Sequence, residues 1–212
     1  MKVQQLIARK IIPFFTVILV SGFSVPAAQA EPLKFEFDKV HSQILFFADH
    51  LGFSISEGEF HDYDGHIMFD RARPENSSVE VTIKTDSIDM DSKPWDDSLK
   101  SEHFFNVAKY PEMTFKSTGI KITGDNTADI TGDFTMLGVT KPVVLHTTHH
   151  KTGKSPFDTH TIVTGFSAVA EIDRSAWGMT YGMPMMSPKV DIRLEVEADH
   201  HVPEGSDHYQ DD

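Results

Sequence analysis

The side chains best suited to chemistry in this sequence are carboxylates and histidines that stand close together. His61 to Gly65 reads His-Asp-Tyr-Asp-Gly, which resembles the start of a calcium-binding loop because Ca²⁺ prefers oxygen ligands. The glutamate that closes an EF-hand loop is missing, so a polar strand or turn is the better interpretation. Asp86, Asp89 and Asp91 also cluster, and we expect them to be solvated or to cap nearby backbone.

Histidines form two further groups. His146, His149 and His150 fall on a predicted strand, where only His146 and His150 share a face. Two histidines without a third ligand make a weak metal site. Three more histidines lie among acidic residues in the segment 199–212, and flexible ligands of this kind lose entropy on binding a metal. We predict no specific metal site, but a metal- or haem-handling protein that uses surface and tail histidines is kept as the alternative function.

The motifs of common enzyme classes are absent from the sequence. It contains no G-x-S-x-G, H-E-x-x-H, P-loop or G-x-G-x-x-G pattern. It also contains no Cys, which excludes thiol catalysis, thiolate metal sites and disulfides. Because apolar residues are plentiful and catalytic machinery is missing, we predict a binding protein with no catalytic residues, not an enzyme.

The first thirty residues predict export. They combine three cations, an apolar run from Ile11 to Val25 and the small-x-small sequence Ala28-Gln29-Ala30, the features of a cleaved secretory signal. The run is shorter than the ~20 residues of a spanning helix, so we expect cleavage after Ala30 and no stable membrane insertion. Residues 31–212 then carry 16 Lys and Arg against 32 Asp and Glu. This negative charge should repel nucleic acid and anionic membrane surfaces.

The elements that must position any functional side chains are strands, as residues 128–147 show most clearly. Residues 137–140 can turn the chain, because Gly138 is free to adopt a positive φ. The strand before this turn alternates, which is typical of a strand with one buried face and one solvated face. Its apolar face carries Ala128, Ile130, Gly132, Phe134 and Met136. The sequence therefore predicts an antiparallel hairpin here.

The rest of the chain repeats this pattern. Strands are predicted over residues 33–40, 43–51, 56–70, 79–88, 112–122, 143–147, 161–173 and 189–198. The apolar phase shifts within 56–70, which predicts a bulge or sharp bend near Gly65. Residues 91–100 predict a short helix, with Ser92 as N-cap and Pro94 at the first helical position, followed by a helical turn over 102–108. We expect the segment 199–212 to be disordered.

About eight antiparallel strands with one helical insert predict an all-β fold. Such a set suits either a two-sheet sandwich or a closed barrel. Closure removes the edge strands, and an eight-stranded barrel is just wide enough for one small ligand. No second domain and no repeat is visible in the sequence.

Motifs along nearly the whole of residues 31–198 resemble the YceI-like family. They include Phe37-Asp38-x-x-His41-Ser42, His50-Leu51-Gly52, Gly65-x-Ile67-x-Phe69-Asp70, Tyr110-Pro111, the run Gly132 to Val143, and Arg174-x-x-Trp177-Gly178. The resemblance implies an extended eight-stranded antiparallel lipocalin-like β-barrel with a short helical insert. It also implies a periplasmic protein, often a homodimer. The ligand implied is a polyisoprenoid, isoprenoid quinone or fatty-acid-like amphiphile, held non-covalently inside, and no cofactor or catalytic residue is implied. The sequence departs from the family where Phe35 or Phe37 replaces the usual Trp of the first strand.

Candidate ligand contacts are apolar side chains that point inward or stand near the expected mouth. We expect the lipid tail to enter between the helical insert and residues 177–186. The inward candidates are Phe46, Phe60, Phe69, Phe115, Phe134, Met136 and Phe166, and those at the mouth are Trp95, Leu99, Phe105, Trp177 and Met179. The alternative for the mouth residues is that they plug the barrel ends. His50 and Arg174 are candidates for a head group, although a structural hydrogen bond or ion pair is favoured for both.

Overall fold

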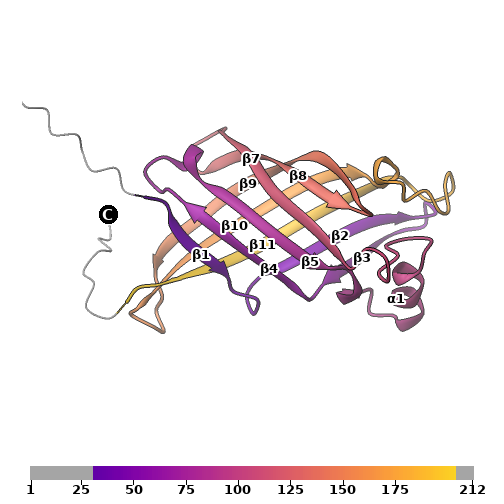
Figure 1. The fold of residues 1–212 in the computed structure, drawn as a ribbon, viewed down its shortest axis with the longest axis horizontal. Coiled ribbons are helices and arrows are strands. Elements are labelled where there is room, and N and C mark those ends of the chain that lie inside the picture. Colours follow the sequence, from indigo (N-terminus) through magenta and orange to yellow (C-terminus); the bar gives the residue numbers. More distant parts are fainter. Residues whose placement is uncertain (1–30, 204–212) are drawn as a thin grey trace, which may run out of the picture.

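The chain forms an elongated barrel of antiparallel strands (Figure 1). The computed structural model describes residues 31–203, so the predicted signal and residues 204–212 of the predicted tail lie outside the described residues. The elements in chain order are β1 (Leu33–Phe37), β2 (Gln43–His50), β3 (Ser54–Phe60), β4 (Tyr63–Phe69), η1 (Pro74–Asn76), β5 (Ser78–Lys84), η2 (Thr85–Ser87), β6 (Ile88–Asp89), α1 (Lys93–Lys100), β7 (Glu112–Ile122), β8 (Thr127–Met136), β9 (Val139–Lys154), β10 (Thr161–Asp173), η3 (Arg174–Trp177) and β11 (Lys189–His201).

The barrel is closed by β11. One edge of β11 pairs with β10 along its whole length, and the other edge pairs first with β2 and then with β1. The ring of hydrogen-bonded strands runs β1-β4-β5-β7-β8-β9-β10-β11 and returns to β1, while β3 and β6 continue the sheet beyond β2. The predicted eight-stranded antiparallel barrel with one helical insert is therefore confirmed.

Three neighbouring strands of the barrel wall are each broken into two segments, and the three breaks lie side by side. β1 and β2 are separated by a corner over 38–42, β4 and β3 by His61 and Asp62, and β5 and β6 by η2. Backbone bonds join two of these breaks, from the His61 N–H to the Ser87 carbonyl at 3.3 Å and from the Lys84 N–H to the Asp62 carbonyl at 2.8 Å. The bend predicted near Gly65 was placed wrongly. The apolar phase shifts at His61–Asp62, because buried Phe60 and Tyr63 are an odd number of residues apart.

Buried polar contacts fasten the first corner to β11. The Ser42 hydroxyl donates to the Glu197 carbonyl at 3.0 Å and accepts from the Glu197 N–H at 3.1 Å. The Tyr63 hydroxyl donates to the Ser42 carbonyl at 2.6 Å. Burial raises the pKa of Tyr63 to about 12, so this donor keeps its proton at neutral pH. At this corner the regular hydrogen bonding between strands stops, and these side-chain bonds pair the backbone groups that would otherwise lack a partner.

A β-bulge keeps the inner face of β7 apolar along its length. Met113 and Phe115 point inward at odd positions, whereas Ile120 and Ile122 point inward at even positions. The register with β8 shifts between Ser117 and Gly119, which inserts the one extra residue that this change of phase requires.

The helical insert lies at one end of the barrel, and residues 31 and 203, where the described part of the chain begins and ends, lie at the other (Figure 1). α1 begins one residue earlier than predicted, and Ser92 occupies the N-cap position without a side-chain capping bond. The helical turn predicted over 102–108 forms non-helical turns instead. In the part of the chain that the structure describes, no helix is long and apolar enough to cross a membrane.

The first residues of the segment predicted to be a disordered tail, 199–201, belong to a strand. β11 continues through Asp199 and His200 to His201, because these residues pair with the first residues of β10. The His200 imidazole bonds the Lys34 carbonyl at 2.8 Å, and the His201 imidazole bonds the Thr161 hydroxyl at 2.9 Å. Only polar residues follow Ala198 up to His201, so the apolar alternation ends there, and the pairing with β10 is what defines the true strand end.

Candidate ligand-binding site

The inner faces of the strands enclose a cavity of about 340 Å³. Its wall is almost wholly apolar and follows the barrel from Phe104 and Met179 near α1 to Pro74 and Asn126 at the opposite end. Strand alternation explains this wall, because every second side chain of each strand faces inward. A cavity of this volume with a few polar groups is typical of a site for an apolar small molecule.

Ten of the twelve predicted contact residues line this cavity. They are Phe46, Phe60, Phe69, Leu99, Phe105, Phe115, Phe134, Met136, Phe166 and Met179. Each comes from a predicted inward strand position, from α1 or from the segments at the α1 end. The structure thus brings together around one space residues spread over more than a hundred positions of sequence.

Trp95 and Trp177 do not reach the cavity wall. Trp95 on α1 is 38% exposed, and its ring packs edge-on against His50 with centroids 5.4 Å apart. Trp177 is 5% exposed but lies behind Phe134, where its indole N–H donates to the Phe134 carbonyl at 3.2 Å. A buried indole needs such an acceptor, and this requirement fixes the ring away from the cavity. Trp177 therefore supports a wall residue and does not line the cavity, whereas Trp95 stands at the α1 end outside the wall.

The aliphatic part of the wall was not among the predicted contacts. Its members sit on the inward phase of predicted strands, and they include Ile120, Ile130, Val143, Leu145, Ala168, Ile172, Ile192 and Leu194. The alternation that predicted the strands indicates these positions, but the predicted contacts were aromatic and methionine side chains together with Leu99. Met186 and His149 on the wall were not predicted contacts either, whereas Arg174 was a candidate for a head group.

Two glycines let aromatic rings lie close to the wall. Phe46 faces Gly58 across β2 and β3, and a Cβ added to Gly58 would lie 2.3 Å from the Phe46 ring. A Cβ added to Gly132 on β8 would likewise lie 2.3 Å from the ring of Phe115 on β7. Glycine in a strand marks such a close approach. Because the rings occupy the space above the neighbouring backbone, they take up less of the interior.

Arg174 is the cation on the wall at the α1 end. Its Nε donates to the Ser187 carbonyl at 3.1 Å, and its Nη1 donates to the carbonyls of Met179 at 2.9 Å and Tyr181 at 3.1 Å. The residue is only 6% exposed, and burial lowers the pKa of the guanidinium. The bonds organise the 179–187 segment, so the predicted structural role of Arg174 is present.

His149 is a polar group near the opposite end. Its Nε2 lies 2.9 Å from the Thr152 hydroxyl, which in turn lies 2.7 Å from the Thr164 hydroxyl. Its ring packs against Phe69 and Phe166, with centroids 5.3 Å and 5.0 Å away. Burial is the main cause that lowers the pKa of His149, so the neutral imidazole is favoured.

The outer histidines do not form a metal site with one another. His146 and His150 share one face of β9, as predicted, and both are exposed there. His146 pairs with Asp129 at 2.8 Å and His150 with Ser167 at 2.7 Å. His149 points the other way, toward the cavity.

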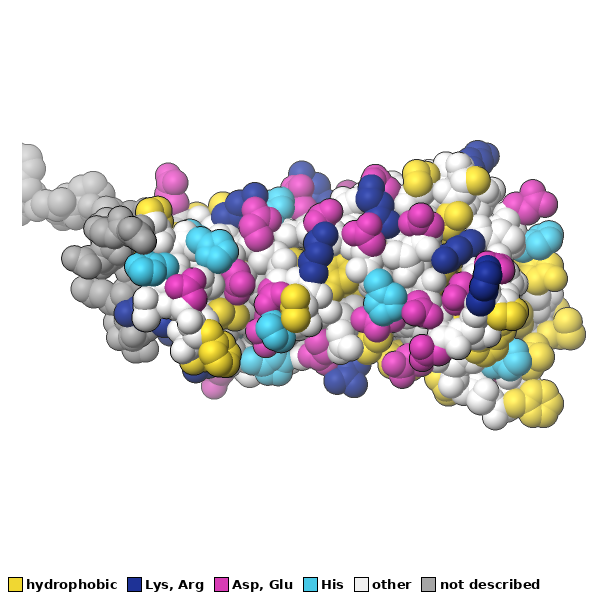
Figure 2. Space-filling view, turned by 90° about the horizontal axis from the view of Figure 1, so that it is seen from below, with side chains coloured by type: hydrophobic (Ala, Val, Ile, Leu, Met, Phe, Trp, Pro, Cys, Tyr) yellow, Lys and Arg dark blue, Asp and Glu magenta, His cyan; other side chains and the backbone are white. Residues whose placement is uncertain are grey.

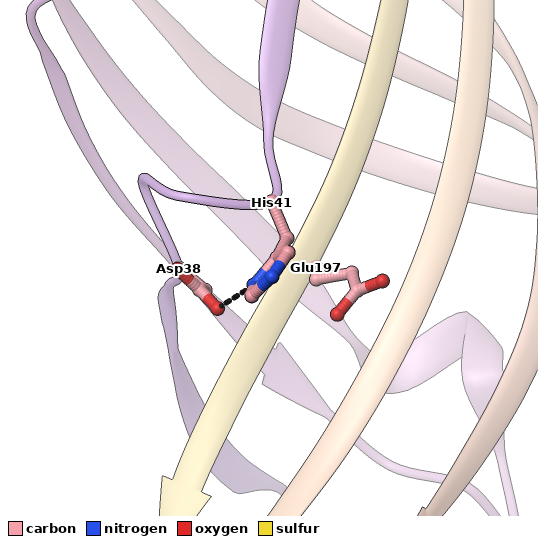
Figure 3. A group of neighbouring side chains, drawn as sticks. All are labelled: Asp38, His41 and Glu197. Atoms are coloured by element: carbon pink, nitrogen blue, oxygen red, sulfur yellow. Dashed lines mark hydrogen bonds and ion pairs between the residues drawn. The ribbon is translucent and has the colours of Figure 1, made fainter.

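Among the described residues, one group of three possible metal ligands lies within reach of a single ion. Asp38, His41 and Glu197 meet outside the barrel, where Asp38 and Glu197 flank the imidazole (Figure 3). The Asp38 carboxylate is 2.6 Å from His41 Nδ1, and this bond raises the pKa of His41. A metal needs the neutral imidazole, so the ion pair competes with metal binding.

A closed antiparallel barrel around an apolar cavity defines a lipocalin-like fold. Comparison with known families identifies which one. The model of the YceI-like domain matches residues 35–198, and the chain belongs to the YceI-like family. A UPF0312 protein of Azotobacter vinelandii is 39% identical over 173 residues, which cover 81% of this chain and 89% of the relative. A UPF0312 protein of Ectopseudomonas mendocina is 38% identical over 181 residues, covering 84% and 94%.

Solved structures share the fold. The structure of Burkholderia cenocepacia BcnA aligns with a TM-score of 0.69 at 25% identity and covers 76% of this chain and 99% of its own. The YCEI protein of Campylobacter jejuni aligns with a TM-score of 0.63 at 30% identity, covering 72% and 89%. A polyisoprenoid-binding domain from Saccharophagus degradans aligns with a TM-score of 0.60 at 12% identity, covering 81% and 99%, which shows a common fold.

Proposed function

We propose that this protein is a periplasmic binding or carrier protein that holds one long-chain apolar ligand inside the barrel. The ligand is a polyisoprenoid, an isoprenoid quinone or a fatty-acid-like amphiphile, bound without covalent attachment. The observation that carries the proposal is the apolar cavity that follows the barrel from one end to the other. The function requires no catalytic residue and no other cofactor.

Burial of a lipid chain supplies a sufficient driving force. Each CH₂ that leaves water contributes ~0.8 kcal/mol, so a sixteen-carbon tail gains roughly 12–13 kcal/mol before costs. Association costs of about 4–15 kcal/mol oppose this gain. A chain of this length is therefore needed for useful affinity, and a cavity that extends along the barrel can provide contacts over such a length.

Further support comes from the relatives and from the exterior. The family resemblance implies a polyisoprenoid-like ligand, and a fold neighbour is by its description a polyisoprenoid-binding domain. Hydrophobic side chains gather at the α1 end of the surface (Figure 2). Exposed apolar residues there include Phe53, Trp95, Tyr181, Met183 and Met185. We place the entry of the lipid at this end. The export signal, the periplasmic location and the homodimer remain predictions from the sequence.

Phe134→Asp tests the proposal directly. Phe134 lines the cavity from β8, so a carboxylate there should abolish binding of a fluorescent fatty acid while circular dichroism still shows a folded barrel. Val144→Asp is the matched control, because Val144 is an exposed apolar residue on the adjacent strand β9. Undiminished binding by a folded Phe134→Asp variant would show that the ligand does not use the interior.

A further inference from the structure

Arg174 has donors that the protein does not use. A guanidinium carries five N–H donors, and the bonds from Nε and Nη1 to the carbonyls of Ser187, Met179 and Tyr181 account for three of them. Nη2 is buried and makes no hydrogen bond within the described residues. Arg174 also belongs to the cavity wall. The two N–H groups of Nη2 are therefore unused, on a side chain that is only 6% exposed.

Among the residues that the structure describes, no ion pair neutralises the charge of Arg174, although the nearby charge of Asp173 favours the cationic form. Its neighbour Asp173 does not form an ion pair with it and instead accepts from the Ser175 N–H at 2.9 Å and the Ser175 hydroxyl at 2.6 Å. The carboxylate of Asp49, also on the wall, accepts from the Gly52 N–H at 2.8 Å. Between residues 31 and 203, no salt bridge to Arg174 is present. A buried cation without a directly bound counter-ion is costly, and the carbonyl dipoles and the charge of Asp173 offset this cost only in part.

We propose that Nη2 of Arg174 binds an anionic oxygen, of a phosphate or a carboxylate, at the head of the lipid. This inference rests on the proposed function and sharpens it, because it selects the anionic members of the ligand class. It also orients the ligand. The head group lies at the α1 end, beside Met179 and Met186, and the chain runs toward Phe69 and Phe166 at the opposite end.

The opposite orientation is less favourable. The polar groups at the far end are His149, Asp125, Asn126 and the hydroxyls near η1, which supply no buried cation. His149 already bonds Thr152 and is surrounded by two phenylalanine rings. Each end of the cavity also carries one carboxylate, Asp49 near α1 and Asp125 at the far end, so Arg174 is the group that distinguishes the two ends. An anionic head group is therefore matched by one end of the cavity only.

The test compares lipids that differ only at the head. Farnesyl phosphate against farnesol, and palmitate against hexadecanol, are measured by displacement of a fluorescent lipid from the whole protein. A charge-assisted hydrogen bond should make the anionic member of at least one pair bind about tenfold or more tightly. Comparison of the two pairs shows whether phosphate or carboxylate is the preferred anion. Equal affinity of wild-type protein for anion and alcohol in both pairs would overturn the inference but leave the carrier function intact, whereas no binding of any of the four probes would contradict the carrier function itself.

Variants assign the preference to Arg174. Arg174→Met should bring the anion down to the affinity of the alcohol, while the alcohol still binds and reports an intact cavity. Arg193→Met is the matched control, since Arg193 is an exposed arginine on β11 paired with Glu195, and it should keep the full preference. If Arg174→Met binds neither lipid, Arg174→Lys decides. Lysine retains the charge without the planar fork, so a reduced preference supports the inference and an unchanged one rejects it.

Discussion

At the scale of single residues, Arg174 and His149 lie at opposite ends of the cavity and differ in chemistry. Arg174 at the α1 end is a cation held by backbone carbonyls. His149 at the other end is an imidazole among aromatic rings, and its burial disfavours the protonated form. The Arg174 end can therefore attract an anionic head group, and the neutral His149 imidazole offers an uncharged surface to an apolar chain.

His149 should make stability fall as the solution becomes acidic. Its folded pKa is lowered below the ordinary 6.5, so below about pH 6.5 the unfolded chain takes up a proton that the folded protein resists. The stabilisation is present above pH 6.5 and is lost as the pH falls through the folded pKa, with a slope of at most about 1.4 kcal/mol per pH unit. Urea unfolding between pH 7.5 and 5 measures it.

His149→Gln should flatten this pH dependence. His146→Gln removes an exposed histidine from the same strand and should leave the His149 component in place. If His149→Gln and wild type lose stability in parallel, the imidazole of His149 is not the group that titrates.

At the scale of elements, close pairing of glycine and phenylalanine keeps the interior open. Gly58 with Phe46 and Gly132 with Phe115 allow large rings to lie over a neighbouring strand. Because a ring in this position leaves part of the barrel centre unfilled, the same residues that stabilise the wall preserve the cavity.

Gly132→Ala should destabilise the barrel and weaken lipid binding together. The new methyl would lie 2.3 Å from the Phe115 ring and 2.7 Å from the Lys116 carbonyl, so the ring must move into the cavity. Overpacking of this kind costs about 1–3 kcal/mol. Thermal unfolding and lipid displacement measure the two effects. Gly119→Ala is the control, because nothing lies within 4 Å of its added Cβ; equal behaviour of the two variants would mean that Phe115 does not need the glycine.

The strands could be predicted from the sequence more completely than the bulges and breaks that interrupt them. Alternation gave the strands and the inward faces, as on β8, and the turn at Gly138 has the positive φ that was expected, 73°. A phase shift, however, looks the same in sequence whether it becomes a bulge, as in β7, or a break, as between β3 and β4. The pairing partners decide between these outcomes, and they are distant in sequence.

The candidate site was predictable where side chains follow the strand period. It was not predictable where a hydrogen bond to a backbone carbonyl sets the orientation of a side chain. Trp177 turns toward the Phe134 carbonyl, and Arg174 is held by carbonyls from a segment without regular structure. Such contacts depend on backbone groups whose position appears only in the fold.

At the scale of the whole molecule, the α1 end carries the features expected of an entrance. It combines the exposed apolar side chains, the irregular 178–188 segment and the buried Arg174. The two sides of this end touch where the His103 and Tyr181 rings stack with centroids 4.6 Å apart. Movement of one side against the other would admit a lipid.

Cross-linking this contact should trap or exclude the ligand. The native chain has no cysteine, so His103→Cys with Tyr181→Cys can be joined by a short bifunctional thiol reagent without side reactions. We expect lipid exchange, followed by displacement of a fluorescent lipid, to slow at least about tenfold after cross-linking. Each single variant treated with the same reagent is the control. Exchange at the original rate in the cross-linked protein would place the entrance elsewhere.

The most direct test of a lipid-filled barrel is native mass spectrometry of the protein purified from a bacterial host that exports it, followed by extraction and identification of any bound lipid. We predict a one-to-one apolar adduct on the wild type and on Val144→Asp, and none on Phe134→Asp. A wild-type protein that is empty and takes up no added lipid, or a Phe134→Asp variant that carries the same adduct, would contradict a ligand site inside the barrel.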